Sequence, residues 1–374
     1  MDDEDLPICI SSRLFLKLSL MWPLKGEAQK WLYARLVVYI VASSLSFTSL
    51  ILMHIIKSVE EGGIDISEDL AILAATLGLT SMMVLYAVKQ QDLLGLLRDL
   101  CDFSKFGQPP RFKRHNEILD LCVKVVFSYA IFGAVVYNLI KIVEIPKCKR
   151  LRKIREVCGV FVPLWTPFDA DHEAVLTLLA VWVFLVVIVL DKVTLMVSLQ
   201  VLEISWNIKM RIDQLKSMIS RCFRGDVATG RSRLNECIQY HIDIISYANR
   251  FNSCFTNGMF IHLATTGIIC GCLENQIAKE QHLGAILHIL GWITSLFVSC
   301  LGGQILMDSS SSIADAAYNS NWYNANVQMR RDLIVMIVRS QKPLFVATGA
   351  FNVLCFSLFV TIMKMSYSIL TLLK

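Results

Sequence analysis

Seven apolar segments, each long enough to cross a lipid bilayer, restrict the fold of this chain more than any other feature. A helix rises about 1.5 Å per residue, so about 20 apolar residues cross the roughly 30 Å hydrocarbon core. A helix also pairs its own backbone polar groups, which lipid cannot do. The chain is therefore predicted to be an all-α membrane protein with seven transmembrane helices. These spans are predicted at residues 33–56, 70–88, 121–143, 174–201, 255–273, 284–307 and 344–373.

The composition agrees with a membrane protein and argues against nucleic-acid binding. Hydrophobic residues make up 55% of the chain and charged residues 18%, whereas soluble domains carry roughly 25% charged residues. The net charge of +5 is spread over several loops and is not gathered in one basic arm. The acidic start, Met1 to Asp5, has the wrong charge for a secretory signal peptide. The first span is therefore expected to target the chain to the membrane.

Lysine and arginine between the spans predict the orientation of the chain. With the N-terminus in the cytoplasm, the inner segments hold 22 of these residues and the outer segments hold 11. Cytoplasmic loops carry the excess of basic residues in membrane proteins, so a cytoplasmic N-terminus and an extracellular C-terminus are predicted. A basic run at 147–155 lies in a loop assigned to the outside, and longer loops follow this rule less strictly.

The segments between spans indicate how the chain is organised. Residues 203–254 repeat apolar residues at helical spacing and are predicted to extend spans four and five beyond the membrane as two helices, with a break at 224–226. Together with residues 313–338 they can form an intracellular helical bundle. The predicted parts are a cytoplasmic N-terminal segment (1–32), spans one to four (33–202), a cytoplasmic helical segment (203–254), spans five and six (255–307), a cytoplasmic helix and basic stop (308–343) and the last span (344–374).

Short motifs near the C-terminus are the most specific part of the sequence. They are Gly-Gln at 303–304, Ser-Asn-Trp-Tyr at 320–323, Arg-Ser-Gln-Lys-Pro at 339–343 and Ser-Tyr-Ser at 366–368. In this order they resemble the C-terminal signature of the insect odorant receptors. The resemblance implies a plasma-membrane subunit that binds a small volatile odorant and opens a cation channel. It also implies a heterotetramer with the insect odorant co-receptor, in which subunits contact one another through the intracellular bundle.

The last span is predicted to form one helix from Phe345 to Leu373. At about 100° per residue, Cys355, Ile362, Ser366 and Ile369 lie within roughly 40° of Leu373, and Lys364 lies on the opposite side. The final helix of insect odorant receptors lines an ion pore, with apolar gate residues near the C-terminus. The resemblance therefore implies a pore face and gate formed by Ile362, Ser366, Ile369, Leu372 and Leu373.

The resemblance places the odorant site in the outer half of the bundle, among spans two to six. On the third span Ala130, Gly133 and Tyr137 occupy positions i, i+3 and i+7, which share one helical face. This face combines small residues with an aromatic wall, as an apolar ligand site requires. Ordinary helix packing also uses small residues and explains each position equally well. Further candidates at matching depth are Leu77, Leu179, Val183, Ile268 and Cys272.

Other seven-span receptors fit the sequence less well. Gustatory receptors share the architecture and resemble one another through Thr-Tyr followed by Gln-Phe in the last helix, whereas this chain has no Gln-Phe after Ser366-Tyr367. A G-protein-coupled receptor has an extracellular N-terminus and an Asp-Arg-Tyr-like triplet after span three, where this chain reads Lys-Ile-Val-Glu at 141–144. The odorant co-receptor carries a longer loop between spans four and five than residues 203–254 provide.

No enzyme, cofactor or metal site is predicted. No nucleophile with a base, phosphate-binding glycine loop or paired carboxylates can be assembled, and no internal repeat suggests a transporter. Among 12 cysteines, Cys148 and Cys158 share the proposed extracellular loop, where a disulfide is possible. Cys270-Gly271-Cys272 is too tightly spaced for a metal site. The Asp191-Lys192 pair in span four is better explained by mutual compensation or snorkelling than by an ion relay.

Overall fold

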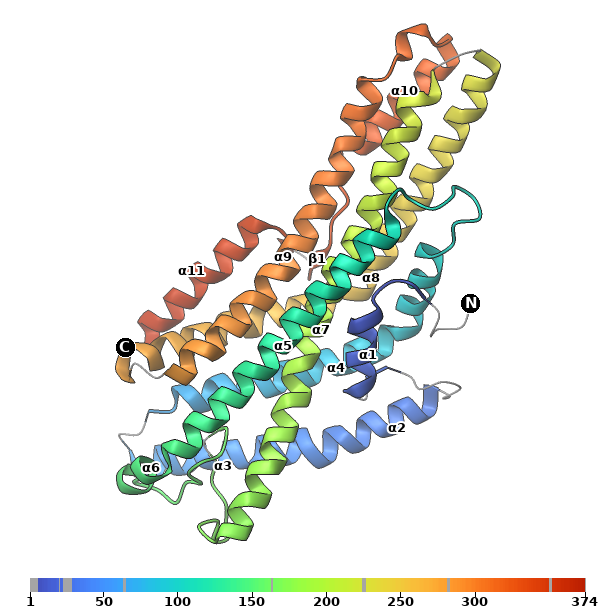
Figure 1. The fold of residues 1–374 in the computed structure, drawn as a ribbon. Helices are drawn as coiled ribbons and strands as arrows, with labels where there is room; N and C mark the ends of the chain where they lie inside the picture. Colours follow the sequence, from blue (N-terminus) through green and yellow to red (C-terminus); the bar gives the residue numbers. More distant parts are fainter. Residues whose placement is uncertain are drawn as a thin grey trace.

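The computed structural model describes residues 6–19, 21–22, 29–62, 65–162, 164–223, 227–280, 283–349 and 352–373. Seven helical runs in these ranges are long and apolar enough to cross a membrane (Figure 1), which confirms the predicted fold class. The first combines α2 (Gln29–Tyr39), the π-helical turn η1 (Ile40–Leu45) and α3 (Ser46–Glu61). The others are α4 (Ser67–Leu100), α5 (Phe112–Val143), α7 (Glu173–Cys222), α8 (Val227–Glu280), α9 (Leu283–Tyr318) and α11 (Phe356–Leu373).

Shorter elements connect and cover these helices. The helix α1 precedes the first span and is held to α7, because the Ser12 hydroxyl donates to Glu203 Oε2 at 2.6 Å. Its Ser11 backbone N–H also donates to Asp120 Oδ1 of α5 at 2.9 Å. The short elements are α1 (Ile10–Leu18), α6 (Ile145–Leu151), the 3-10 turn η2 (Trp322–Asn324), α10 (Val327–Ser340) and the strands β1 (Ala347–Thr348) and β2 (Asn352–Val353).

The helices α7 and α8 are too long to end at the membrane. They contain 50 and 54 residues, which corresponds to about 75 and 80 Å at 1.5 Å per residue. Figure 1 shows the end of α7, the start of α8 and the end of α9 gathered with α10 at one end of the molecule. The predicted stripe of Ile204, Ile208, Ile212 and Leu215 is fully buried there, as a bundle requires. The predicted break at 224–226 lies outside the described residues.

Two glycines allow neighbouring helices to approach closely. A Cβ on Gly78 of α4 would lie 2.2 Å from Thr265 Cγ2 of α8. A Cβ on Gly271 of α8 would lie 2.6 Å from Ile369 Cβ and 2.9 Å from the Ser366 carbonyl oxygen of α11. Helices in lipid have no hydrophobic driving force to associate and depend on close van der Waals packing, which small residues at the interface permit. The helix α8 is thus in contact with both α4 and α11.

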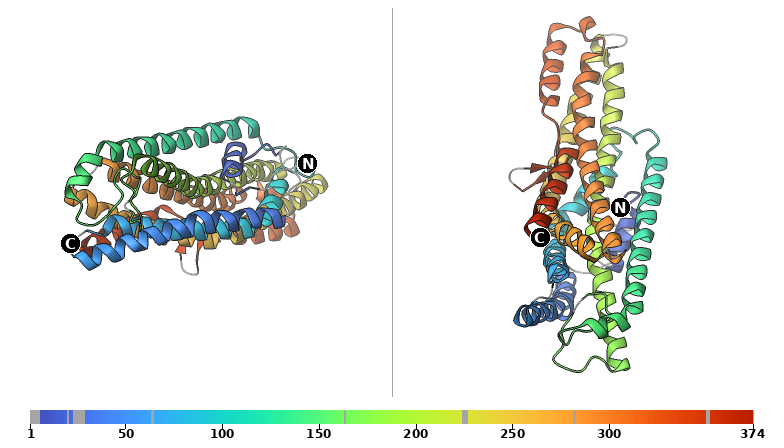
Figure 2. Two further views of the ribbon diagram at one scale, coloured as in Figure 1. Left: turned by 90° about the horizontal axis from the view of Figure 1, so that it is seen from below. Right: turned by 90° about the vertical axis from the view of Figure 1, so that its left-hand side faces the viewer.

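The prediction of one continuous last helix from Phe345 is wrong. The strands β1 and β2 pair antiparallel before α11 begins, and Figure 2 shows this short hairpin beside α11 in its right-hand view. Gly349, directly after β1, has a φ of 68°. This left-handed conformation does not occur inside an α-helix, and glycine adopts it without steric cost. The Asn252 side chain accepts from the Ala347 N–H at 2.6 Å, and the Gln304 side chain accepts from the Phe356 N–H at 3.3 Å. These partners outside the segment replace intrahelical bonds, so α11 starts after Cys355.

Candidate functional site

A cavity of about 120 Å³ lies between α5, α7 and α9 and is closed on one side by the loop that follows α6. Its walls are mainly aliphatic and aromatic, as expected for a site that holds a small apolar molecule. An engineered apolar cavity of about 150 Å³ in another protein binds benzene, so this volume suits a compact ligand. The lining residues are Val126, Tyr129, Ala130, Ile131, Gly133, Ala134, Tyr137, Phe161, Ile188, Lys192, Thr194, Leu195, Leu287, His288, Gly291, Trp292, Thr294 and Ser295.

The predicted face of α5 forms one wall of this cavity. Ala130, Gly133 and Tyr137 all line it. A Cβ placed on Gly133 would meet nothing within 4 Å, so the missing side chain leaves open space there. The ring of Tyr137 lies 4.4 Å from that of Phe161, between ring centroids. The structure therefore brings these three residues together, and their contact with a ligand stays a prediction.

The other five predicted binding residues do not line the cavity. Leu77 and Ile268 are 53% and 41% exposed on the outer surfaces of α4 and α8. Val183 and Cys272 are buried in helix packing, and Leu179 is half-buried. The contact of Gly78 with Thr265 fixes the rotation of α4 and turns Leu77 away from the bundle. The face of α4 nearer the cavity instead carries Ile72, Ala75, Thr76 and Leu79, which line a second, smaller cavity that shares Phe161 and His288 with the first.

The helix α9 supplies the wall that the sequence reasoning missed. Trp292 Nε1 donates to His288 Nε2 at 3.1 Å, one helical turn away. Ser295, on the same face, lies 2.9 Å from Ser198 of α7 between hydroxyl oxygens. His288, Gly291, Trp292 and Ser295 repeat the small-plus-aromatic pattern of α5 at helical spacing. That pattern could have predicted the α9 wall from the sequence. Phe161 lies in a loop, and no pattern in the neighbouring sequence predicts that it lines the cavity.

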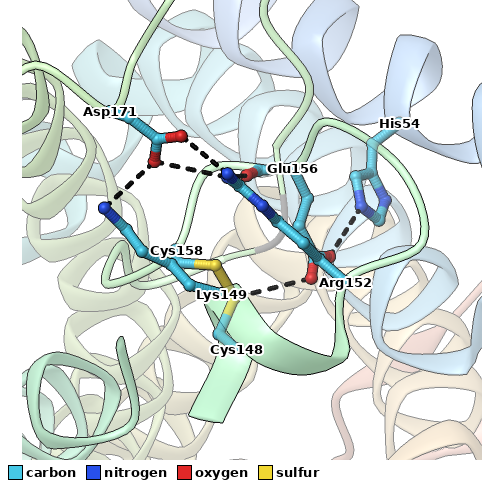
Figure 3. The surroundings of a disulfide bond; sticks show 7 residues. All are labelled: His54, Cys148, Lys149, Arg152, Glu156, Cys158 and Asp171. Carbon is cyan, nitrogen blue, oxygen red and sulfur yellow. Dashed lines mark hydrogen bonds and ion pairs between the residues drawn. A yellow bond between two sulfur atoms is a disulfide. The ribbon is translucent and has the colours of Figure 1, made fainter. Parts of the chain in front are cut away.

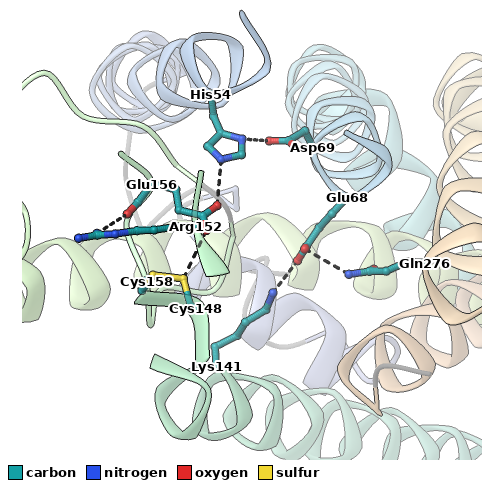
Figure 4. A network of polar contacts seen from close by, with 9 residues as sticks. All are labelled: His54, Glu68, Asp69, Lys141, Cys148, Arg152, Glu156, Cys158 and Gln276. Atoms are coloured by element: carbon teal, nitrogen blue, oxygen red, sulfur yellow. Dashed lines mark hydrogen bonds and ion pairs between the residues drawn. A yellow bond between two sulfur atoms is a disulfide. The ribbon is translucent and has the colours of Figure 1, made fainter. Parts of the chain in front are cut away.

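A polar network lies beside the cavity, near the start of α4 and the end of α5 (Figure 4). Glu68 of α4 accepts from Tyr137 Oη at 3.0 Å, from Lys141 Nζ at 2.8 Å and from Gln276 Nε2 of α8 at 3.2 Å. His54 of α3 lies between two carboxylates: its Nδ1 is 2.7 Å from Asp69 and its Nε2 is 3.3 Å from Glu156. The network therefore joins a cavity-wall side chain to α4, α5 and α8.

A disulfide between Cys148 and Cys158 fixes the loop that covers the cavity, which confirms the pairing considered possible from the sequence. Figure 3 shows Asp171 between Lys149 and Arg152 beside it, with Nζ 3.2 Å and Nη2 2.7 Å from the carboxylate oxygens. The hydrogen bond from Arg152, assisted by Lys149, lowers the pKa of Asp171. The loop that carries Phe161 is thus attached covalently to α6 through Cys158, and the ion pairs of Asp171 hold its far end against α6 and its own beginning.

The predicted pore face of α11 mostly contacts α8 in this chain. Ile362 and Ser366 are buried, and the Ser366 hydroxyl donates to Glu274 Oε1 of α8 at 3.0 Å. Ile369 lies against Gly271. Leu373 is half-buried and Leu372 is 85% exposed. Lys364 is exposed on the side away from the buried face, as the helical phase predicts, and the role of these residues in a pore stays a prediction.

Comparisons with known proteins agree on one family. The family model described as 7tm Odorant receptor matches residues 63–367. Odorant receptor Or2 of Anopheles gambiae is 28% identical over 44% of this chain and 47% of its own length. The matched region therefore spans about half the length of that relative. Odorant receptor 85c of Drosophila melanogaster is 22% identical over 76% of both chains.

Solved structures show the same fold over the whole chain. The insect olfactory receptor OR5 of Machilis hrabei in complex with eugenol has a TM-score of 0.78 to this chain at 15% identity, covering 98% of this chain and 97% of the other. The structure of that receptor described without eugenol also has a TM-score of 0.78, at 18% identity. At these identities the likeness concerns the fold alone.

Proposed function

Since the chain belongs to the odorant receptor family of insects, we propose that it is an odorant-binding subunit of a ligand-gated cation channel. Its ligand is a small, volatile and mostly apolar molecule. The channel opens when this subunit is assembled with the insect odorant co-receptor in a heterotetramer. Members of this family are receptors, so no enzymatic activity is proposed.

The observation that carries this proposal is the apolar cavity between α5, α7 and α9. An odorant brings little besides apolar surface, and burial of that surface supplies most of its binding free energy. Ala130, Gly133 and Tyr137 are proposed to contact it from α5, with His288 and Trp292 opposite on α9. Leu77, Leu179, Val183, Ile268 and Cys272 lie off the cavity, and the proposal does not depend on them.

A chain of residue contacts connects the cavity to the proposed pore helix, α11. A ligand that displaces the Tyr137 ring changes the hydrogen bond to Glu68, which also holds Gln276 of α8. The helix α8 contacts α11 at Gly271 and at Glu274. The gate is proposed at Ile369, Leu372 and Leu373, where apolar side chains from several subunits block ions by dewetting. Ile362 and Ser366 continue that face along α11.

The subunit is proposed to lie in the plasma membrane with its N-terminus in the cytoplasm and its C-terminus outside. The basic-residue count of 22 against 11 supports this orientation. The bundle of α7, α8, α9 and α10 then lies inside the cell, where it is proposed to contact other subunits. Much of α5 is exposed and apolar, as with Phe132 and Leu139, which suits contact with lipid.

Current recordings test the function directly. Cells that express the chain with the co-receptor are exposed to a panel of volatile compounds and compared with cells that express the co-receptor alone. We expect odorant-evoked cation currents that require the chain. Evoked currents that are identical without the chain, although it reaches the cell surface, contradict the proposal.

A further inference from the structure

Lys192 is the charged side chain among the described residues that line the cavity. It lies on α7 and is half-buried. Its Nζ lies 5.2 Å from the ring centroid of Phe127 on α5. This contact directs the ammonium from α7 toward α5, the helix that carries Ala130 and Gly133 on the cavity wall. A cation therefore stands at the edge of a site whose other walls are mainly apolar.

Among the described residues that line the cavity, none carries an acidic side chain. The side chain of Asp191, considered above as a partner of Lys192, lies outside what the structure describes. Two lysines of α5, by contrast, form ion pairs. Lys124 Nζ lies 2.7 Å from Asp120 Oδ2, and Lys141 Nζ lies 2.8 Å from Glu68 Oε1. Among the described side chains, the contact shown for Lys192 is the face of Phe127. A cation–π contact attracts the ammonium to the ring face and leaves its N–H donors available to an oxygen ligand.

A charge in a membrane-spanning helix is costly unless it finds a partner or reaches the interface. A carboxylate binds an ammonium through charge-assisted hydrogen bonds, which are roughly twice as strong as hydrogen bonds between neutral groups. The remaining walls, such as Ala130, Ile188 and Leu195, suit a hydrocarbon chain. The cavity thus pairs a single cationic end with an apolar body.

Resting on the proposed function, we propose that this cavity selects small molecules in which an apolar chain carries a carboxylate, and that Lys192 recognises the carboxylate. Short-chain carboxylic acids are the ligand class that fits both parts of the site. A neutral ester of equal size fills the same volume and lacks the negative charge. Lys192 is therefore a specificity-determining residue.

Hexanoic acid and its isomer methyl pentanoate provide a matched test, because they contain the same atoms and differ in charge at neutral pH. Dose–response curves for both are recorded from cells that express the chain with the co-receptor. We expect the wild type to respond to hexanoate at lower concentration than to the ester. Lys192→Met removes the charge, keeps an unbranched side chain that is one atom shorter, and is expected to raise the half-maximal concentration for hexanoate about tenfold or more. The response to the ester stays within about threefold, since apolar contacts are retained.

Two control variants separate recognition from general damage. Lys192→Arg retains the cation and is expected to retain the preference for hexanoate. Lys124→Met removes a lysine of α5 that is paired with Asp120 outside the cavity lining, and is expected to leave both curves unchanged. Surface labelling confirms equal expression. An equal shift of both curves in Lys192→Met, or a wild type that responds to the ester and not to hexanoate, overturns the inference.

Direct binding distinguishes this inference from the proposed function. Thermal unfolding of the purified chain is measured with hexanoate and with methyl pentanoate, because a ligand that binds the native state raises Tm. Stabilisation by hexanoate that Lys192→Met abolishes, without any evoked current, supports the inference and contradicts the channel function. Absence of both stabilisation and current with hexanoate in the wild type overturns the inference.

Discussion

Tyr137 takes part in two sets of contacts. Its ring forms part of the cavity wall, and its hydroxyl donates to Glu68 at 3.0 Å. Glu68 also accepts from Lys141 and from Gln276. Hydrogen bonds in a low-dielectric setting strengthen one another, so loss of one member alters the others. The ring is therefore proposed to contact the ligand, while the hydroxyl links Tyr137 to Glu68 of α4 and, through Glu68, to Gln276 of α8.

Removal of the Tyr137 hydroxyl is expected to separate binding from channel opening. Tyr137→Phe keeps the aromatic wall, so the half-maximal odorant concentration should change by less than about threefold, while the maximal current falls by about half or more because the link to Glu68 is lost. Tyr129→Phe removes another hydroxyl from the cavity lining, on an exposed tyrosine, and serves as the control. Whole-cell currents normalised to surface expression give both quantities. Unchanged maximal current in Tyr137→Phe contradicts the proposed route.

Gly133 leaves open space on the cavity wall. Gly133→Leu should occupy that space and raise the half-maximal concentration of any activating odorant about tenfold or more, with surface expression retained. Gly258→Leu introduces the same side chain on α8, at another glycine whose Cβ would meet nothing within 4 Å and which does not line the cavity. Odorant dose–response curves should separate the two variants. If Gly133→Leu and Gly258→Leu both overlay the wild type, the α5 face does not bind the ligand.

The contact of α8 with α11 depends on two glycines in different surroundings. A Cβ on Gly271 meets the Cβ of Ile369 and the backbone of Ser366, which cannot move without the whole helix. A Cβ on Gly267 meets Met365 Cε at 2.3 Å, the far end of a flexible side chain that can adopt another rotamer. The position of α11 is therefore set at Gly271 more than at Gly267.

Alanine at each glycine tests how the position of α11 affects the gate. Gly271→Ala should displace α11 and change basal current at least about twofold, because overpacking typically costs about 1–3 kcal/mol and is relieved by backbone movement. Gly267→Ala should remain near the wild type. Basal currents in the presence and absence of a channel blocker measure the difference, with surface labelling as the expression control. Equal behaviour of the two variants would mean that α11 does not move as a unit.

The apolar segments predicted the seven spans because each is continuous in sequence. Helix ends were less predictable: α4 continues from the predicted end at residue 88 to Leu100, since charged residues such as Lys89 and Asp92 pair with each other along the helix surface. The start of α11 depends on Asn252 and Gln304, which are far away in the sequence. The sequence of the segment itself cannot show such distant partners, so the start of α11 could not be predicted from it.

The cavity was predictable only where its residues share one helix. Ala130, Gly133 and Tyr137 recur at helical spacing, so their common face follows from helix geometry. The rotation of each helix about its axis depends on packing, and for α4 that packing is the contact of Gly78 with Thr265. This is why Leu77 faces outward. The lining also includes residues of α9 and none of the residues predicted on the fifth span, a placement that depends on helix packing and not on any local pattern.

The orientation of the whole chain can be tested with epitope tags. Tags placed at the N-terminus and within residues 224–226 should be accessible to antibody only after permeabilisation, because basic residues concentrate in these segments. A tag after Lys374 should be labelled on intact cells. Immunofluorescence before and after permeabilisation gives the result. Labelling of the N-terminal tag on intact cells would reverse the proposed topology.

The length of α11 makes the proposed pore sensitive to the thickness of the surrounding membrane. The helix has 18 residues, or about 27 Å at 1.5 Å per residue, slightly less than the roughly 30 Å hydrocarbon thickness of a typical bilayer. The other spans exceed that thickness and can tilt to fit, whereas a short helix makes the lipid thin around it at a cost of fractions of a kcal/mol per Å. Channels reconstituted in lipids of increasing acyl-chain length should therefore show a progressive change in basal open probability. A sterol-rich, thicker sensory membrane would then act on this receptor through its last helix before any odorant arrives.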